Sequence, residues 1–120
     1  MSIYQRFCTE IMDRQGNLQS LSLHYPENFN FGYDVVDAIA GETPGKTALV
    51  WCNPENEERR FTFAQIKRDS DRMANVFEHA GIGRGDRVML VLKRHYEYWF
   101  AVVALHKLGE IGRASCRERV

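Results

Sequence analysis

The sequence predicts a mixed α/β fold in which a β-hairpin precedes a strand–helix–strand–helix crossover. Residues 47–52 (TALVWC) are rich in β-branched and aromatic side chains and are followed by the turn-forming run NPEN. Thr62 and Gln65 have the spacing of a capping box, and an apolar stripe with helical period follows them. Residues 88–92 (VMLVL) form a continuous apolar run bounded by charge, which is typical of a strand buried on both faces.

Before the hairpin we expect a helix and then a connecting arm. Residues 2–15 begin with SIYQ, which matches a capping box, and their apolar side chains recur on one helical face up to the stop at Gly16. Residues 17–32 are rich in aromatic side chains but show no long period, so they are expected to be irregular. Residues 34–40 then form a predicted short helix that ends at Gly41.

After the hairpin, two helices and one strand complete the predicted order. The capping box at Thr62 starts a helix that ends at Gly81, and residues 95–108 form a second helix that ends at Gly109. The strand over residues 88–92 lies between the two helices. A strand, helix, strand order of this kind implies a right-handed crossover.

Length, charge and cysteine usage narrow the functional class. The chain has 120 residues, suited to one small domain, and a formal net charge of +0 that gives no electrostatic footprint for nucleic acid. No apolar run approaches the roughly 18 residues that a membrane span needs. Cys8, Cys52 and Cys116 lack metal-site or disulfide spacing, and no targeting segment is visible. We therefore expect a cytoplasmic protein.

The GIGRGDR run at residues 81–87 is predicted to be a structural turn. Its spacing is G-x-G-x-G, and it follows a helix and precedes a strand, which is the reverse of a dinucleotide-binding loop. Glycines at a helix stop permit positive φ, and Asp86 is expected to fix the turn by hydrogen bonds.

Several segments occur in an order that resembles one enzyme family. The segments are FNFGYDVVDAIA, ALVWCN, RRFTFAQI and GIGRGDRVMLVLKRHYEYWFAVVALHKLG. They resemble the opening of the AMP-forming acyl-CoA synthetases, nearest to the acetyl-CoA synthetase-like and medium-chain branches of the adenylate-forming superfamily. The resemblance covers about residues 26–109, so residues 26–109 are expected to be part of the large adenylate-forming domain and residues 1–25 an N-terminal helix and arm.

The resemblance implies an enzyme of fatty acid metabolism that uses ATP, Mg²⁺ and CoA. Such ligases activate a carboxylic acid to an acyl-adenylate, release pyrophosphate and transfer the acyl group to CoA. The motifs that carry this chemistry lie downstream in the family, and none is present here. We therefore assign no catalytic, cofactor-binding or metal residue, expect this chain alone to be inactive, and expect the rest of its own domain to be a partner.

Three sets of side chains are weighed as ligand contacts. Lys93, Arg94 and His95 follow the predicted strand at its carboxyl end, where a phosphate of ATP or CoA could lie, although solvated charge at a helix entry is the favoured interpretation. Aromatic side chains of the helix predicted over residues 95–108 are interpreted as core rather than as an acyl pocket. Isolated histidines are interpreted as surface or core residues, and Cys8 and Cys52 as small apolar packing residues. The aromatic set is Tyr96, Tyr98, Trp99 and Phe100, and the isolated histidines are His24, His79 and His106.

Residues 110–120 (EIGRASCRERV) are predicted to be non-native. Their charges are mixed, they show no period, and DNA that encodes them closely resembles a standard short-read sequencing adapter. We exclude them from the predicted fold, as for a fusion scar.

Two other functions remain open. The chain could come from an adenylate-forming enzyme that loads a carrier protein, which the downstream sequence would distinguish. It could also be a stand-alone small α/β binding module, which would be a closed, monodisperse domain without an unpaired sheet edge.

Overall fold

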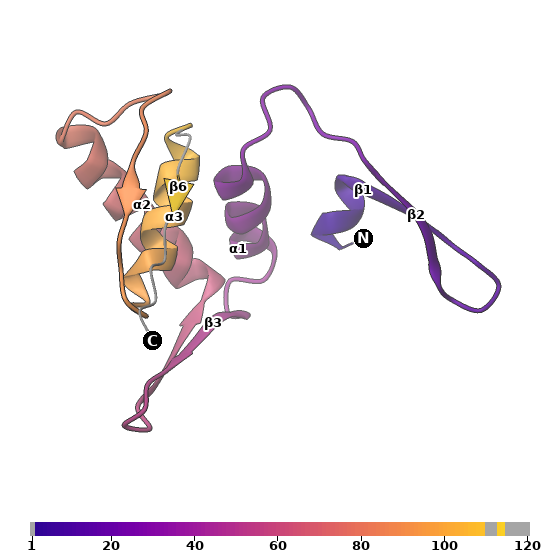
Figure 1. The fold of residues 1–120 in the computed structure, drawn as a ribbon, viewed down its shortest axis with the longest axis horizontal. Helices are drawn as coiled ribbons and strands as arrows, with labels where there is room; N and C mark the ends of the chain where they lie inside the picture. The colour runs from indigo at the N-terminus through magenta and orange to yellow at the C-terminus, as the bar shows by residue number, and fades with distance from the viewer. Residues whose placement is uncertain (1, 110–112, 115–120) are drawn as a thin grey trace.

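The computed structural model describes residues 2–109 and 113–114 (Figure 1). A body of helices lies beside one β-hairpin, and a second hairpin near the N-terminus projects away from it (Figure 1). The mixed α/β class predicted from the sequence is confirmed. In chain order the elements are η1 (Ile3–Arg6), β1 (Cys8–Met12), β2 (Leu18–Leu23), η2 (Gly32–Asp37), α1 (Ala38–Glu42), β3 (Thr47–Cys52), β4 (Glu58–Thr62), α2 (Phe63–His79), β5 (Met89–Leu90), α3 (Glu97–Lys107) and β6 (Arg113–Ala114).

The helix predicted over residues 2–15 is wrong, and the irregular arm predicted over residues 17–32 is confirmed only from residue 24 to residue 31, because residues 18–23 form β2. Only the single 3₁₀ turn η1 forms, and β1 and β2 then pair in an antiparallel hairpin. The turn DRQGN explains the difference, because the Asp13 carboxylate accepts hydrogen bonds from the backbone of Gln15 and Asn17, each at 2.8 Å. Gly16 adopts φ +84°, where a side chain would be strained. The chain therefore reverses where a helix would continue.

The NFNFG segment has a structural role that its composition did not reveal. The Asn30 amide donates to the carbonyl of His106 at 2.7 Å, and its side-chain oxygen accepts from the backbone of Gly32 at 2.9 Å. Asn30 thus joins the end of α3 to the start of η2, a π-helical turn that continues into α1. A Cβ atom at Gly32 would lie 2.6 Å from Cγ of Lys107, so this close approach requires glycine.

The predicted β3–β4 hairpin and the start of α2 are confirmed. The two strands pair antiparallel, and Asn56 at their tip adopts φ +61°. Thr62 Oγ1 accepts from the backbone of Gln65 at 3.2 Å, and the Gln65 side chain accepts from the backbone of Thr62 at 2.8 Å. This reciprocal pair satisfies two backbone donors that a helix start leaves unpaired.

The strand predicted over residues 88–92 is shorter and more exposed than expected. Only Met89 and Leu90 form β5, and Met89 is 74% exposed. β5 pairs in parallel with β6, in a segment where the sequence predicted no element, and not with β3 or β4. The predicted single-sheet crossover is therefore not formed in the described residues, because burial on both faces requires neighbouring strands and covering helices.

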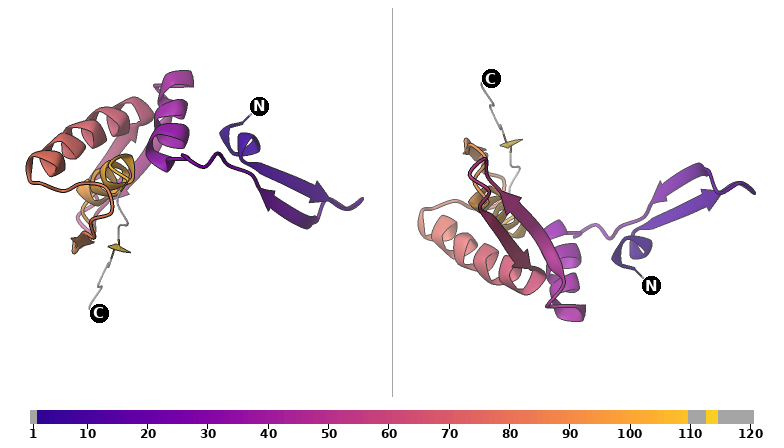
Figure 2. Two further views of the ribbon diagram at one scale, coloured as in Figure 1. Left: turned by 90° about the horizontal axis from the view of Figure 1, so that it is seen from above. Right: turned by 90° about the horizontal axis from the view of Figure 1, so that it is seen from below.

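The helical segments η2, α2 and α3 lie against one face of the β3–β4 hairpin (Figure 2), and the hydrophobic core lies between these elements. Its buried members are Val36, Ile66, Phe100 and Val103. Half-buried side chains from the hairpin and the two long helices surround them. These are Leu49, Phe61, Phe63, Met73 and Tyr96. The hairpin thus supplies the apolar cover that the helices need on one side.

A buried ammonium group links the three helical segments of the body. Lys107 Nζ lies 2.8 Å from Asp37 Oδ1 and 2.6 Å from Asp71 Oδ1, and it donates to Ser70 Oγ at 3.0 Å. The Lys107 side chain has 0% exposure. Burial raises the pKa of Asp71, but hydrogen bonds from Lys107 and Lys67 outweigh this and hold that pKa below its ordinary value. The Lys107 cluster, formed by Lys107, Asp37, Ser70 and Asp71, therefore joins η2, α2 and α3 through ion pairs and a hydrogen bond.

Replacing Lys107 by methionine should destabilise the chain strongly. The carboxylate of Asp37 is largely buried, and Lys107→Met removes a cation that pairs with it. Removing one partner of a buried ion pair costs about 3–5 kcal/mol in the free energy of unfolding. The exposed Lys93 is the matched control, since Lys93→Met should change the free energy of unfolding by less than about 0.5 kcal/mol. Urea denaturation measures both, and equal effects would contradict a structural role for the cluster.

Candidate functional site

A polar pocket of about 360 Å³ opens between the tip of the β3–β4 hairpin and the segment that joins β5 to α3. Its lining residues are Trp51, Cys52, Asn53, Pro54, Lys93, Arg94 and His95. The structure thus brings together the three basic residues that the sequence weighed as phosphate contacts. All three are exposed, which also fits the favoured interpretation of solvated charge at a helix entry.

The backbone of this polar pocket is held in a rarely populated conformation. Arg94 adopts φ +53°, in the left-handed region that costs a residue with a side chain about 1 kcal/mol. The Trp51 indole donates to the carbonyl of Arg94 at 2.8 Å. This hydrogen bond joins β3 to the loop before α3 and fixes where the chain enters the helix.

The aromatic side chains of α3 divide between the core and the surface. The Tyr96 and Phe100 rings lie 5.0 and 5.3 Å from the Phe61 ring, so the interpretation of these two residues as core is confirmed. Trp99 is 50% exposed and contacts the Tyr98 ring edge-on at 5.3 Å. The four aromatic residues therefore do not line one acyl pocket in the described chain.

Arg59 on β4 also contacts this aromatic group. Its guanidinium donates to the Tyr96 hydroxyl at 3.1 Å and lies 5.3 Å from the centre of that ring. A cation over an aromatic face is attracted by the ring quadrupole. Arg59 is thus packed against an aromatic side chain of the body.

Histidine and cysteine side chains form no metal centre within residues 2–109 and 113–114, where no three His, Cys, Asp or Glu residues are grouped for a cation. His24 is hydrogen-bonded to Thr9 Oγ1 at 3.0 Å, and the His106 ring packs 5.6 Å from the Phe31 ring. Cys8 is half-buried, but Cys52 is exposed, so its interpretation as a packing residue is wrong. Cys116 lies outside the described residues.

The GIGRGDR run is the structural turn that the sequence predicts. Gly81 and Gly85 both adopt φ +88°, and Asp86 accepts from the backbone of Gly83 at 2.7 Å. Its glycines serve the end of α2 and the turn that follows.

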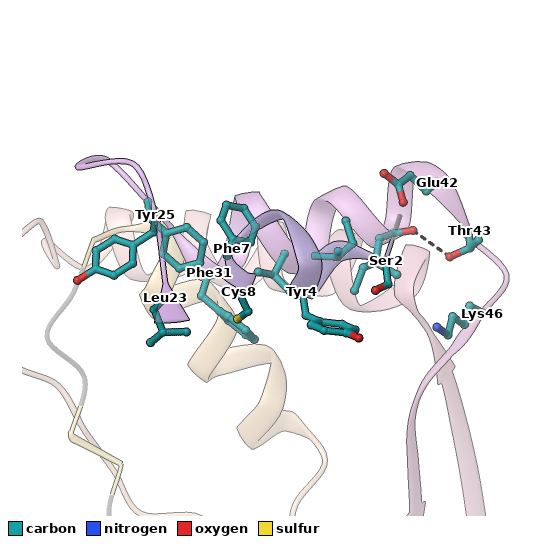
Figure 3. Close-up of a pocket in the computed structure, with 14 residues that line it drawn as sticks. Ser2, Tyr4, Phe7, Cys8, Leu23, Tyr25, Phe31, Glu42, Thr43 and Lys46 are labelled. Atoms are coloured by element: carbon teal, nitrogen blue, oxygen red, sulfur yellow. Dashed lines mark hydrogen bonds between the residues drawn. The ribbon is translucent and has the colours of Figure 1, made fainter. Parts of the chain in front are cut away.

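A larger cavity, the apolar groove, was not predicted. It has a volume of about 730 Å³ and lies between the N-terminal hairpin and the η2–α1 segment (Figure 3). The alternating run SLSL at residues 20–23 could have indicated an apolar strand face, but the lack of a long period over residues 17–32 favoured an irregular arm. The lining residues are Ser2, Ile3, Tyr4, Phe7, Cys8, Leu23, Tyr25, Phe29, Phe31, Val35, Ile39, Glu42, Thr43 and Lys46.

Comparison with known proteins identifies the family. The family described as AMP-binding enzyme matches residues 36–111, which include the polar pocket, α2 and α3. The chain belongs to the AMP-binding enzyme family. No helix among the described residues is long and apolar enough to cross a membrane.

Curated relatives are much longer than this chain. It is 38% identical over 99 residues to the human mitochondrial acyl-coenzyme A synthetase ACSM3, covering 78% of this chain and 17% of that protein. It is also 38% identical over 92 residues to the mitochondrial acyl-coenzyme A synthetase ACSM5 of Rattus norvegicus, covering 72% and 16%. The chain thus spans about a sixth of the length of these relatives.

Solved structures agree with the fold. A fatty acyl CoA synthetase of Mycobacterium tuberculosis matches with a TM-score of 0.63 and 28% identity, over 72% of this chain and 16% of that one. A fatty acid AMP ligase from Legionella pneumophila matches with a TM-score of 0.65 and 24% identity, over 69% and 14%. The described residues therefore correspond to the N-terminal part of adenylate-forming enzymes.

The hydrogen bond from Trp51 should stabilise the polar pocket measurably. Trp51→Phe keeps an aromatic ring against Tyr96 but removes the donor to the Arg94 carbonyl, a loss of about 1 kcal/mol in the free energy of unfolding. Trp99→Phe is the control, because Trp99 is half-exposed and should cost less than about 0.5 kcal/mol. Equal costs in urea denaturation would show that the indole donor is unimportant.

Proposed function

We propose that this chain is an N-terminal segment of an ATP-dependent acid–thiol ligase. The parent enzyme would activate a carboxylic acid with ATP to an acyl-adenylate, release pyrophosphate and pass the acyl group to CoA. The observation that carries the proposal is the family match over residues 36–111 together with 38% identity to acyl-coenzyme A synthetases. Acetate, propionate, medium-chain and aryl acids all remain candidate substrates, because this chain contains no identified acyl pocket.

The described residues do not by themselves fit the cofactors of that reaction. They include no group of carboxylates arranged for Mg²⁺ and no Gly/Ser/Thr-rich loop that would surround phosphates. ATP, Mg²⁺ and CoA are therefore proposed for the parent enzyme, and no reaction step is assigned to a residue of this chain. This chain would contribute to the fold of the AMP-binding domain and would not supply catalytic residues.

The partner of this segment is proposed to be the rest of its own domain. Apolar side chains of the β1–β2 hairpin are half or more exposed, and a two-stranded hairpin is marginally stable alone. Cover from the remaining domain would bury them. The cytoplasmic location stays a prediction, since the curated relatives are described as mitochondrial.

Acid-dependent exchange between ATP and radiolabelled pyrophosphate tests the proposal. The full-length parent should catalyse exchange with at least one of acetate, propionate, octanoate and benzoate, and should then form the matching CoA thioester. The 120-residue chain, assayed beside it, should give no exchange above buffer.

Three results would decide against parts of this proposal. Exchange by the 120-residue chain would show that the chemistry resides in this segment. Exchange by the parent without thioester formation, but with transfer to a carrier protein, would favour a carrier-loading enzyme. A soluble, monodisperse 120-residue chain and an inactive parent would favour a stand-alone binding module.

A further inference from the structure

The apolar run that contains β5 has two faces with different surroundings. Met89 is 74% exposed and Val91 is 66% exposed. The side chains at the alternate positions, Val88, Leu90 and Leu92, are half-buried. Because successive side chains of a strand point to opposite faces, one face of the run is partly covered and the other is open. We call the open face, formed by Met89 and Val91, the β5 outer face.

The β3–β4 hairpin shows how an exposed strand surface is built elsewhere in this chain. Val50 on β3 lies opposite Arg60 on β4, and Cys52 lies opposite Glu58. The Arg60 and Glu58 side chains form an ion pair at 2.7 Å, so charged groups stand beside the exposed side chains of β3. The run over residues 88–92 contains no charged side chain. The β5 outer face therefore lacks the feature that suits the hairpin surface to water.

The pairing of β5 also indicates a second cover. β5 pairs in parallel with β6, and α3 lies between the two strands in the chain. Parallel strands connected through a helix occur almost only in sheets whose two faces are both covered by helices. The exposure of Met89 and Val91 shows that, within the described part of the chain, no segment covers the β5 outer face.

We propose that the β5 outer face binds a helix of the parent enzyme that lies after this segment in the parent sequence. The inference rests on the proposed function, since it requires a longer parent chain. This chain covers 17% of the human acyl-coenzyme A synthetase ACSM3 and corresponds to the N-terminal part of adenylate-forming enzymes, so most of the parent would follow it. A helix is the fitting occupant because helices are what cover the faces of parallel sheets.

The same contact would lengthen β5. Only Met89 and Leu90 form the strand in this chain. A covering helix would exclude water from the backbone of residues 88–92, and buried backbone N–H and C=O groups are almost always hydrogen-bonded. Strand pairing in the parent should therefore extend over the whole apolar run.

Hydrogen exchange of backbone amides, measured by mass spectrometry on the 120-residue chain and on the full-length parent, tests the proposal. Peptides that cover residues 88–92 should exchange about a hundredfold more slowly in the parent, because strand hydrogen bonds and a covering helix protect them. Peptides from the β3–β4 hairpin are the internal control. Because that hairpin is already paired in this chain, their exchange should change by less than about tenfold.

Matched lysine substitutions test the β5 outer face itself. Val91→Lys should leave the midpoint of thermal unfolding of the 120-residue chain unchanged, because Val91 is exposed there, but it should lower that of the parent by several degrees. Val76→Lys is the control, since Val76 is 61% exposed on α2, and it should leave both midpoints unchanged. Val91→Ile, which keeps an apolar side chain, should retain the midpoint of the parent.

Three results would overturn the proposal. Equal exchange of residues 88–92 in the chain and in the parent would show that no cover forms. Slow exchange in the 120-residue chain that depends on its concentration would show that a second copy covers the face. Equal effects of Val91→Lys and Val76→Lys in the parent would show that the β5 outer face makes no contact of its own.

The outcome is independent of the proposed ligase activity, because none of these measurements involves ATP. An inactive parent in which residues 88–92 are protected would contradict the proposed activity and support the docking surface. An active parent in which these residues exchange as fast as in the 120-residue chain would do the reverse.

Discussion

The buried ammonium of Lys107 fixes how the helices of this chain meet. A charge removed from water is tolerated only beside opposite charge, so Asp37 on η2 and Asp71 on α2 must both reach the inner side of α3. The same constraint explains Gly32, because the Lys107 stem passes where a Cβ atom would lie. Asn30 strengthens this arrangement from the neighbouring turn. The apolar core then fills the space that these contacts define.

Local signals in the sequence predicted much of the body. The capping box at Thr62 and the stop at Gly81 are local signals, because each depends only on residues within one turn of its own helix end. Both lie where the sequence predicts them. The β3–β4 hairpin followed from its strand and turn composition. By contrast, the capping box at Ser2 formed correctly but started only the 3₁₀ turn η1, because the Asp13 turn reversed the chain. A helix start signal does not determine helix length.

Features that depend on distant residues could not be predicted. Lys107 reaches Asp71 and Ser70 across 36 and 37 positions, and no short pattern marks such partners. The sequence did place Lys93, Arg94 and His95 beyond a strand end, but it did not show that the Trp51 indole lines the same pocket and donates to Arg94. The apolar groove needed the unpredicted β1–β2 hairpin. The family, however, could be predicted from the order of several sequence segments, because that order does not depend on whether each predicted helix or strand is correct.

The central claim is that this chain is one segment of a longer AMP-binding enzyme, and the assignment of residues 110–120 to adapter-derived DNA remains a prediction. The most direct measurement is a primer-walking read of the source DNA across codon 110. The account predicts that the frame continues from Gly109 into a long coding region with a Gly/Ser/Thr-rich loop and its lysine. Native DNA that encodes residues 111–120 and then a stop codon would contradict it.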